Sequence, residues 1–449
     1  MRLLAFQGLR YTAKAGEAGL LAAPPYDQID DAARDRFHAA SPFHFVHLTR
    51  PSPPDPYQRA AQLHRQWEHD GIIARDERPA IYPYVIQLAD GGPGGRRLGV
   101  MGLAEYAPAS VIRPHEQTLD KPLADRTALL DAMRVDLEPA LLLAEDDGRL
   151  EELLAADLAG PGQPLPPALV DYRDVEGNHH LLFRLDDPAR IAEYQRALAS
   201  RPAAIADGHH RYKVGQLFAA SHPPAGAGPT AAGAKLAVIS SIQAPALTID
   251  PIHRALRTPV DLARLAGART AAEPFHGTTG ADLARAVAAA PQPALGVWTA
   301  GKPPEIWHLA LPAASGTGAD PAASTTEAAA AKRSAGATEA GSAKGSAAGA
   351  AGQRQPLVVQ LFQDSLLPLL GLRPEAVSDG TLVYRSNPDD LYAQIASGEL
   401  GTGFWLPPMI PADFAAAIAH GDMLPPKSTR FLPKAMSGLV WSDHDSRVS

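Results

Sequence analysis

The sequence of 449 residues contains no cysteine. Without thiols the chain cannot form disulfides, use a thiolate nucleophile, or hold zinc or an iron–sulfur cluster through sulfur. Long hydrophobic runs are also missing: no apolar stretch reaches the roughly 18 residues that a transmembrane helix needs, and the start of the chain, Met1 to Phe6, lacks the features of a signal peptide. We therefore expect a cytoplasmic protein without a membrane partner.

Dense clusters of lysine and arginine are absent as well. The formal net charge is −8, from 41 basic and 49 acidic residues. An acidic balance without a local basic patch argues against nucleic acid as a partner. What remains is an ordinary globular composition, 45% hydrophobic and 20% charged, over a length that suggests two or three domains.

A low-complexity segment interrupts the C-terminal half of the chain. From about Ala314 to Gln353 the sequence consists largely of alanine, glycine, serine and threonine, with almost no bulky apolar residue. Such a segment cannot bury enough surface to offset its chain entropy, so we expect a disordered linker over residues 312–355. The linker would separate a C-terminal α+β segment, residues 356–449, from the preceding chain, in which we place a boundary between residues 105 and 106.

Strand-like and helix-like patterns alternate on both sides of this segment. Residues 80–88 and 97–104 read as a β-hairpin around a glycine-rich turn, and residues 56–69 have the apolar spacing of an amphipathic helix. Further helices are expected over residues 125–133, 191–198, 357–367, 388–397 and 412–420, and further strands over residues 236–242, 380–384 and 402–406. Neither a GxxxxGK[ST] motif nor a GxGxxG motif is present. This mixture without a strict β-α-β repeat predicts an α+β fold.

The strongest local signal is Asp207-Gly208-His209-His210-Arg211, which follows the short apolar run Ala203 to Ala206. A strand that ends in Asp-Gly before a helix presents the unpaired N–H groups of the helix N-terminus, which favour anions. Two imidazoles and a guanidinium add donors suited to phosphate. The alternative is an ordinary strand–turn–helix with solvated histidines.

Weaker signals lie elsewhere in the chain. His115-Glu116, followed by Gln117-Thr118 and by Asp125-Arg126, could supply a general base or a metal ligand, or form a surface turn. Lys427-Ser428-Thr429-Arg430 could clamp a carboxylate or phosphate, or form an exposed edge strand. His253, within a polar loop, is a weaker candidate still. We predict no metal site at the scattered histidines, namely His38, His44, His47, His64 and His69.

Taken in order, these motifs resemble one bacterial family, catalogued as domain of unknown function 1015. Pro24-Pro25-Tyr26-Asp27 and the stretch Ser41 to Val46 belong to the resemblance too. The family is similar to ParB partition proteins, sulfiredoxin and free-serine kinases. This implies a ParB/sulfiredoxin-like nucleotide-binding core over residues 106–311, with α/β additions at residues 1–105 and 356–449. Sulfiredoxin chemistry is excluded, because His209 stands where that enzyme carries its cysteine.

Free-serine kinases are the better match, since they have a similar His-Glu, Asp-Gly-x-His-Arg and Thr-Arg order. The resemblance implies that Glu116 accepts the proton of a substrate hydroxyl, with free L-serine as first candidate and ATP or ADP as donor. It implies catalytic roles for Asp207, which would also hold Mg²⁺, and for His209. The implied phosphate ligands are Gly208, His210, Arg211 and Arg126, and the implied substrate ligands are Lys427, Ser428, Thr429, Arg430 and His253.

The sequence also departs from these kinases. The first hundred residues have no equivalent in them, and the spacing from Glu116 to Asp207 is longer, so the pocket could accept another substrate. Tyr26 and Asp27 either line the pocket or close a turn. Two alternatives remain open: a ParB-like nucleotide-binding switch without phosphotransfer, and a scaffold that has lost the chemistry. The sequence does not decide the nucleotide, the acceptor or the oligomeric state.

Overall fold

The computed structural model describes residues 1–91, 95–116, 120–158, 166–222, 230–311, 356–372, 380–444 and 446–449. Gln117-Thr118 and the predicted linker, residues 312–355, lie outside the described residues. The chain divides into two compact units. Unit one contains Met1–Arg254, Tyr384–Leu391 and Leu406–Ser449, and unit two contains Ala255–Val383 and Tyr392–Trp405.

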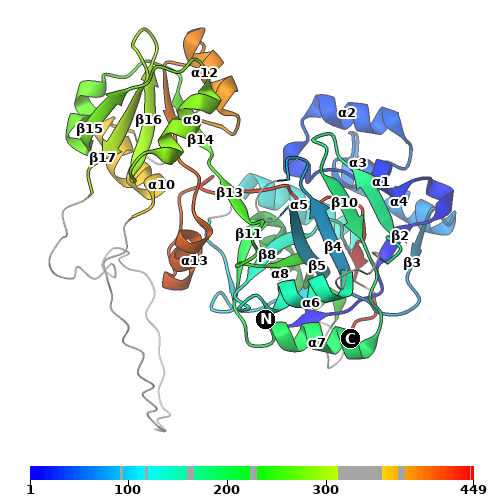
Figure 1. The fold of residues 1–449 in the computed structure, drawn as a ribbon. Coiled ribbons are helices and arrows are strands. Elements are labelled where there is room, and N and C mark those ends of the chain that lie inside the picture. The colour runs from blue at the N-terminus through cyan, green and yellow to red at the C-terminus, as the bar shows by residue number, and fades with distance from the viewer. Residues whose placement is uncertain are drawn as a thin grey trace, which may run out of the picture. The chain divides into compact units, whose positions relative to one another are not determined.

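Unit one is built on a mixed sheet that has nine strands within the described residues (Figure 1). The strand order is β6-β11-β8-β12-β5-β4-β10-β9, and β1 pairs with β5. Most neighbours are antiparallel, but β11 runs parallel to β6 and β12 runs parallel to β8. The strands are β1 (Leu3–Leu4), β4 (Tyr82–Gln87), β5 (Arg96–Glu105), β6 (Ile112–Arg113), β8 (Ala140–Ala144), β9 (Val170–Arg173), β10 (His179–Leu182), β11 (Ala203–Asp207) and β12 (Ala234–Ser241).

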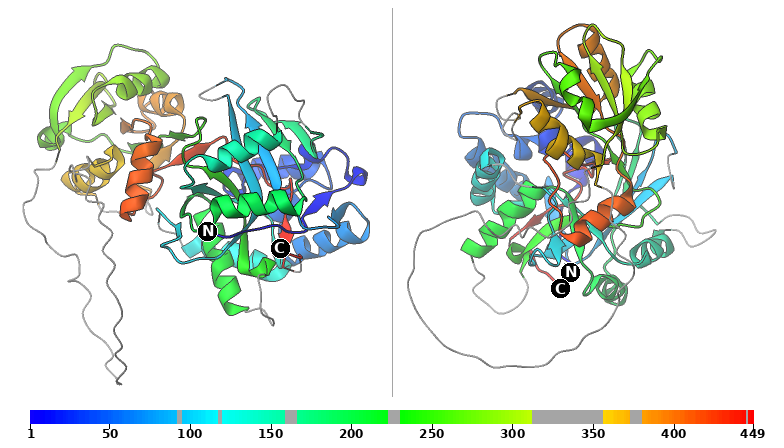
Figure 2. Two further views of the ribbon diagram at one scale, coloured as in Figure 1. Left: turned by 60° about the horizontal axis from the view of Figure 1, so that its bottom comes forward. Right: turned by 90° about the vertical axis from the view of Figure 1, so that its left-hand side faces the viewer.

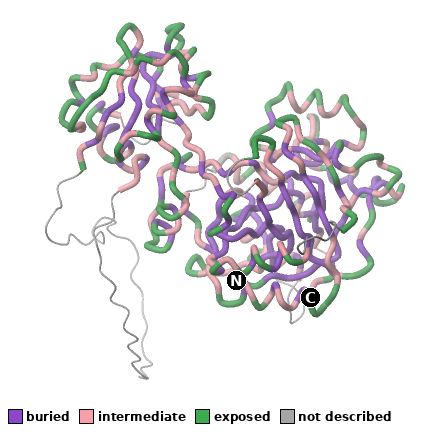
Figure 3. Tube along the Cα trace, in the orientation of Figure 1, coloured by how far each residue is buried: buried purple, intermediate pink, exposed green. Residues whose placement is uncertain are grey.

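The central strands are buried along their whole length, as Figure 3 shows for the middle of the sheet. All eight residues of β12 and all five of β8 are buried. Strands covered on both faces read as continuous apolar runs instead of alternating ones. The predicted hairpin is confirmed, since β4 and β5 pair antiparallel with Tyr82 opposite Met101.

Helices cover this sheet. α6 (Arg149–Leu158) packs on β5 and β12, and α7 (Pro188–Leu198) lies beside α6 and against β1 (Figure 2). α8 (His209–Ser221) packs on β12 and β8 and against α5 (Asp120–Met133), which in turn contacts α4 (Pro56–His69). α6 buries an apolar stripe of Leu150, Leu153, Leu154 and Leu158, whereas the buried face of α8 also includes His209 and Arg211.

Smaller elements complete the N-terminal part of unit one. β2 (Leu9–Tyr11) pairs with β3 (Ile73–Arg75). The remaining elements of this part are η1 (Ala13–Ala15), α1 (Ala18–Leu21), η2 (Tyr26–Gln28), α2 (Asp31–Ala40) and α3 (Val46–Thr49). The buried side chains of Ile29 and Val46 form a small separate core there.

The end of the chain returns to unit one. After α13 (Pro411–His420), β20 (Arg430–Leu432) pairs with β13 (Thr248–Asp250), and β21 (Ser442–Asp443) pairs with β7 (Val135–Asp136). The two termini lie side by side, where the backbone N–H of Ala5 donates to the carbonyl of Ser449 at 2.9 Å (Figure 2). A short helical turn, η3 (Ala231–Gly233), leads into β12.

Unit two is organised around a second sheet, with strand order β15-β17-β16-β19-β14-β18 in the described residues. Its strands are β14 (His253–Leu256), β15 (Arg269–Pro274), β16 (Ala294–Thr299), β17 (Glu305–Leu309), β18 (Leu382–Arg385) and β19 (Thr402–Trp405), of which β14 and β18 begin or end in unit one. Its helical elements are η4 (Leu262–Ala268), α9 (Gly280–Ala289), α10 (Val358–Leu361), the π-helical η5 (Phe362–Leu366), α11 (Leu367–Leu369) and the second half of α12 (Pro388–Ala396), which begins in unit one.

The α+β prediction is confirmed at the level of a mixed α+β protein with a large mixed sheet. β4 and β5 share a sheet with β12, so residues on both sides of position 105 belong to unit one. The predicted helix over residues 357–367 contains a π-helical stretch. No helix in the described part of the chain combines the length and apolarity needed to cross a membrane.

Candidate active site

The turn between β11 and α8 depends on a glycine. Gly208 has φ of 90°, a left-handed conformation that side chains rarely adopt, and it precedes the first residue of α8. A Cβ at this position would lie 3.2 Å from the Cα of Ala140 and 3.1 Å from the Cζ of Arg211. The backbone can therefore turn here only without a side chain. The first N–H groups of α8 have no partner within the helix, which makes this end attractive to an anion.

Asp207, the last residue of β11, is held between two cations. The Nζ atom of Lys434 lies 2.8 Å from its Oδ1 atom, and the Arg211 guanidinium bonds to its Oδ2 atom. Arg211 also donates to the carbonyl of Pro139. Burial alone would raise the pKa of Asp207, but the Lys434 ammonium and the Arg211 guanidinium outweigh burial and hold that pKa well below its usual value. Asp207 is therefore a carboxylate at neutral pH.

Glu116 lies just after β6, and its side chain is 19% exposed. Its Oε1 atom accepts a hydrogen bond from the backbone N–H of Ser428 at 3.1 Å. Burial raises the pKa of Glu116, an effect that the Ser428 N–H and the nearby Lys427 ammonium only partly oppose. A carboxylate whose pKa is raised is a stronger base than an ordinary glutamate, which suits proton abstraction.

Two buried histidines hold Glu116 and the α8 turn together. The backbone N–H of His115 points at the Nε2 atom of His209 at 3.4 Å, and the two rings meet edge to face at 4.5 Å. The Nε2 atom of His115 lies 2.9 Å from the hydroxyl of Thr429. Burial lowers the pKa of His209 to about 4. His209 is therefore neutral at pH 7, so it positions its neighbours and adds no positive charge.

These groups line one cleft of about 240 Å³, which we call the α8 cleft. All the described residues that line it belong to unit one. They come from the N-terminal part of the chain, from the segments around β6 and β11, from the residues just after β13 and β18, and from the C-terminal return: Tyr26, Asp27, Gln28, Glu116, Ala206, Asp207, Gly208, His209, His210, Arg211, Ile252, Ser386, Lys427, Thr429, Arg430 and Lys434.

Basic side chains gather on this cleft. Lys427, Arg430, Lys434 and Arg211 line it; half-buried His210 lines it too, but burial lowers its pKa, so it adds little positive charge. Arg254 donates to the carbonyl of Lys427 at 3.0 Å and so fixes the segment that carries it. Clustered cations beside an open helix N-terminus form a site for phosphate or another multivalent anion.

Three predicted ligands do not line the cleft. The Arg126 guanidinium lies 4.2 Å above the ring of Tyr26 and donates to the carbonyl of Thr49 at 2.8 Å, so it supports the cleft wall. Ser428 contributes only its backbone N–H to Glu116. His253 is buried, and its Nδ1 atom accepts from the backbone N–H of Leu406 at 3.2 Å.

Lys434 and Glu138 also shape the cleft, although no sequence motif marks them. Lys434 follows the short strand β20 and Pro433, and a lone lysine after a proline gives no signal of its own. Glu138 accepts from the backbone N–H of Tyr26 at 2.9 Å and from the hydroxyl of Ser437 at 3.2 Å, so it joins the N-terminal and C-terminal walls. Nothing in its local sequence marks this role.

The magnesium ion predicted at Asp207 does not fit this arrangement. Both carboxylate oxygens of Asp207 already bond to cationic side chains. Within the described residues, no group of three or more histidine, aspartate or glutamate side chains is arranged to hold a metal ion. Lysine and arginine side chains occupy the place around Asp207 that a divalent cation would need.

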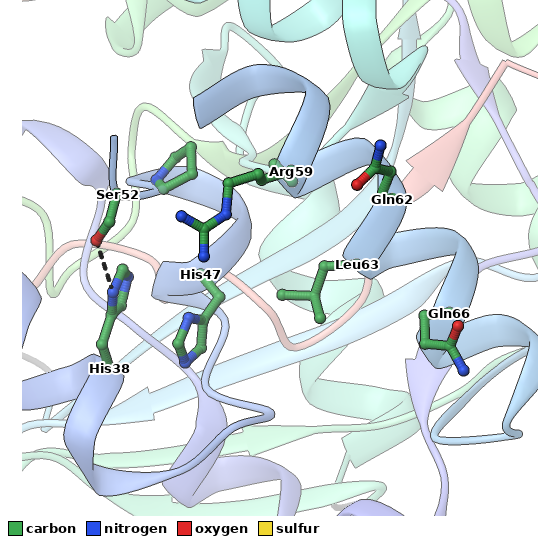
Figure 4. Close-up of a pocket in the computed structure, with 9 residues that line it drawn as sticks. His38, His47, Ser52, Arg59, Gln62, Leu63 and Gln66 are labelled. Carbon is green, nitrogen blue, oxygen red and sulfur yellow. Dashed lines mark hydrogen bonds between the residues drawn. The ribbon is translucent and has the colours of Figure 1, made fainter. Parts of the chain in front are cut away.

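Another pocket of about 390 Å³ lies among α2, α3 and α4 (Figure 4). There the rings of His38 and His47 stack at 4.0 Å, and the Nδ1 atom of His38 lies 3.1 Å from the hydroxyl of Ser52. Among the described residues, this pocket and the α8 cleft have no lining residue in common.

These features define the class of protein. It is a mixed α+β protein whose cationic cleft lies at a turn between a strand and a helix that depends on a glycine. The sequence profile of the family described as "Protein of unknown function (DUF1015)" matches residues 3–278, more than half of the chain, and the chain belongs to this family. The match includes Glu116 and the β11–α8 turn. It ends before Lys427 to Lys434, although the motif resemblance extends to Thr429.

Solved structures show weak similarity. A conserved hypothetical protein from Pyrococcus furiosus is 11% identical with a TM-score of 0.34, over 74% of this chain and 90% of that chain. A free serine kinase in complex with AMP is 12% identical with a TM-score of 0.33, over 73% and 88%. SbnI from Staphylococcus aureus, truncated at its C-terminus, is 11% identical with a TM-score of 0.31, over 74% and 82%. Such TM-scores transfer no site or activity, and no curated protein matches the chain.

Proposed function

We propose that the protein is a nucleotide-dependent phosphotransferase that moves a phosphoryl group from ATP or ADP to the hydroxyl of a small molecule. The observation that carries this proposal is the presence of Glu116 in the same cleft as the N-terminus of α8 and the side chains of Lys427, Arg430 and Lys434. A base and a cationic anion site in one cleft are two of the parts that phosphoryl transfer uses.

In this mechanism the α8 cleft binds the phosphates of the nucleotide. The N–H groups at the start of α8 and the ammonium of Lys434 neutralise the charge on the transferring group and on the leaving phosphate. Asp207 keeps Lys434 and Arg211 in place through its two carboxylate oxygens. Magnesium accompanies nucleotides in solution, but Asp207 does not belong to a set of metal ligands. The mechanism therefore gives magnesium no role at Asp207.

Glu116 accepts the proton of the acceptor. The acceptor oxygen attacks the terminal phosphorus, the bond from phosphorus to the leaving nucleotide oxygen breaks, and the hydroxyl proton passes to the Glu116 carboxylate. The Ser428 N–H fixes one oxygen of that carboxylate, at 3.1 Å, which leaves the other for the acceptor. Free L-serine is the first acceptor to try, on the strength of the motif order described above.

The test uses the full chain with L-serine and either ATP or ADP, supplied with Mg²⁺, and detects O-phosphoserine by mass spectrometry. Glu116→Gln is expected to lower turnover about 10²- to 10⁴-fold, because it removes the base without changing the size of the side chain. ADP affinity, measured by calorimetry, is expected to stay within about threefold, since Glu116 does not supply positive charge.

Glu151→Gln is the matched control. Burial raises the pKa of Glu151 to about 7, so it is another perturbed glutamate, but it lies on α6 and does not line the cleft. Its turnover is expected to equal that of the wild type. ADP binding without phosphorylated product from any acceptor would contradict the kinase proposal and favour a nucleotide-binding switch.

A further inference from the structure

A second pocket lies next to the α8 cleft and shares Glu116 with it. It has a volume of about 460 Å³, within the range of small-molecule sites. Glu116 and His209 line both this space and the cleft, so they stand between the two. We call it the acceptor pocket.

The walls of the acceptor pocket are mixed, with somewhat more apolar than polar surface. Ile112 and Ile205 come from the neighbouring strands β6 and β11, Pro114 follows β6, and Tyr212 comes from α8. Lys213 is its one cation among the described residues, and that side chain is exposed at the rim. An apolar body in this pocket would lose water contact, which is the main source of binding free energy for such groups.

The pocket is held in shape without a ligand. The hydroxyl of Tyr212 accepts from the backbone N–H of Ala107 at 3.4 Å, which ties the segment before β6 to α8. Tyr106 meets Tyr212 edge to face at 5.3 Å. A Cβ on Gly215 would lie 1.9 Å from the Tyr106 hydroxyl, so only glycine lets Tyr106 pack there.

The position of Glu116 decides which molecule belongs in this pocket. A general base must be within hydrogen-bond reach of the hydroxyl that it deprotonates. The cations and the helix N-terminus that suit phosphates lie in the α8 cleft, so the acceptor approaches Glu116 from the acceptor pocket, which has fewer cations and more apolar surface. We propose that the acceptor pocket binds the apolar body of the phosphoryl acceptor, and that the substrate class is a hydroxyl compound larger and more apolar than free serine. This rests on the proposed function.

The experiment compares two acceptors that differ only in apolar size. L-Serine methyl ester and L-serine benzyl ester have the same hydroxyl and the same charge. The assay uses the full chain and the nucleotide that supports transfer. We expect kcat/KM for the benzyl ester to exceed that for the methyl ester by about tenfold or more, because the benzyl group fills the pocket. A ratio near one would overturn the inference, even where both esters are phosphorylated.

Gln216→Trp tests the pocket directly. Gln216 lies on α8, is half-buried and lines the pocket, so a bulky ring there should fill part of it. The benzyl-to-methyl ratio of kcat/KM is expected to fall several-fold. Ala220→Trp is the control, because Ala220 is exposed one turn further along α8 and does not line the pocket, so the ratio should not change.

Two further outcomes separate this inference from the proposed function. If no acceptor is phosphorylated, the proposed function fails, and calorimetry with ADP present then decides the pocket: benzyl ester binding that Gln216→Trp weakens supports it, and no such binding overturns it. If Gln216→Trp weakens ADP but not inorganic diphosphate, the pocket holds the nucleotide base and the inference is wrong.

Discussion

At the scale of single residues, burial of Glu116 sets the expected pH dependence. Burial raises the pKa of Glu116 above its ordinary value of 4.5. The base works only when deprotonated, so activity should be full above that pKa and fall as the pH drops through it. We expect an acid limb in kcat/KM that lies above pH 4.5 and that is missing from the residual activity of Glu116→Gln. A profile with the same acid limb in both proteins would assign the titration to another group.

Lys434 offers a second test at this scale. Its Nζ atom lies 2.8 Å from Asp207 and 3.5 Å from Asp27, and its side chain is 15% exposed. Lys434→Met leaves Asp207 with Arg211 alone, so the free energy of unfolding should fall by about 1–3 kcal/mol. ADP affinity should fall about tenfold or more, because a phosphate-facing charge is lost.

Denaturant unfolding and calorimetry measure these two effects of Lys434→Met. Lys302→Met is the control, because Lys302 is exposed and does not line the cleft. Its free energy of unfolding should change by no more than about 0.5 kcal/mol. Unchanged ADP affinity in Lys434→Met would show that Lys434 serves the fold alone.

At the scale of elements, the β11–α8 turn needs its glycine. Gly208→Ala would place a Cβ about 3.2 Å from Ala140 in a left-handed backbone. We expect a loss of about 1–3 kcal/mol in the free energy of unfolding, and weaker ADP binding as the first turn of α8 shifts. Gly233→Ala is the control, because the nearest atom to its Cβ would be 3.4 Å away and φ is not positive. It should change neither the free energy of unfolding nor ADP affinity by much. Equal stability of the two variants would contradict this role of the turn.

Elements with long local patterns were predictable from the sequence. The helix predicted over residues 56–69 is α4, and the strand predicted over residues 236–242 is β12 with a shift of about two residues. The β11–α8 turn was predictable too, because an apolar run, a glycine and a helical pattern follow each other directly. In all three, the residues that determine the element are neighbours in the chain.

The rest of the site depends on contacts between distant segments. β6 has two residues and β20 has three, too few for a pattern, yet they carry Glu116 and Lys434 to the cleft. The guanidinium of Arg126 is a group that commonly binds phosphate, but here it stacks on Tyr26, a hundred residues earlier in the chain. Local sequence cannot reveal which distant partner a charged side chain will meet.

At the scale of the whole molecule, the low-complexity segment should be dispensable for ligand binding. Every described residue that lines the α8 cleft belongs to unit one. We expect a chain in which residues 312–355 are replaced by a glycine–serine sequence of equal length to bind ADP within about twofold of the wild type, by calorimetry. A loss of more than about tenfold would give the segment a functional role.

The C-terminal return, in contrast, should be essential, although the family match ends at residue 278. Trp441 is fully buried, with its ring 5.4 Å from Tyr11 and 5.0 Å from Phe45, and Asp443 pairs with Arg75. Each buried aromatic is worth about 1.5–3 kcal/mol, so losing this segment removes a large part of the few kcal/mol by which a protein is stable. We expect a chain of residues 1–278 to show no cooperative thermal transition by circular dichroism and no ADP binding, and co-expression with residues 380–449 to restore both in part. A cooperative transition in residues 1–278 alone would show that the matched region folds without the segment that carries Lys434.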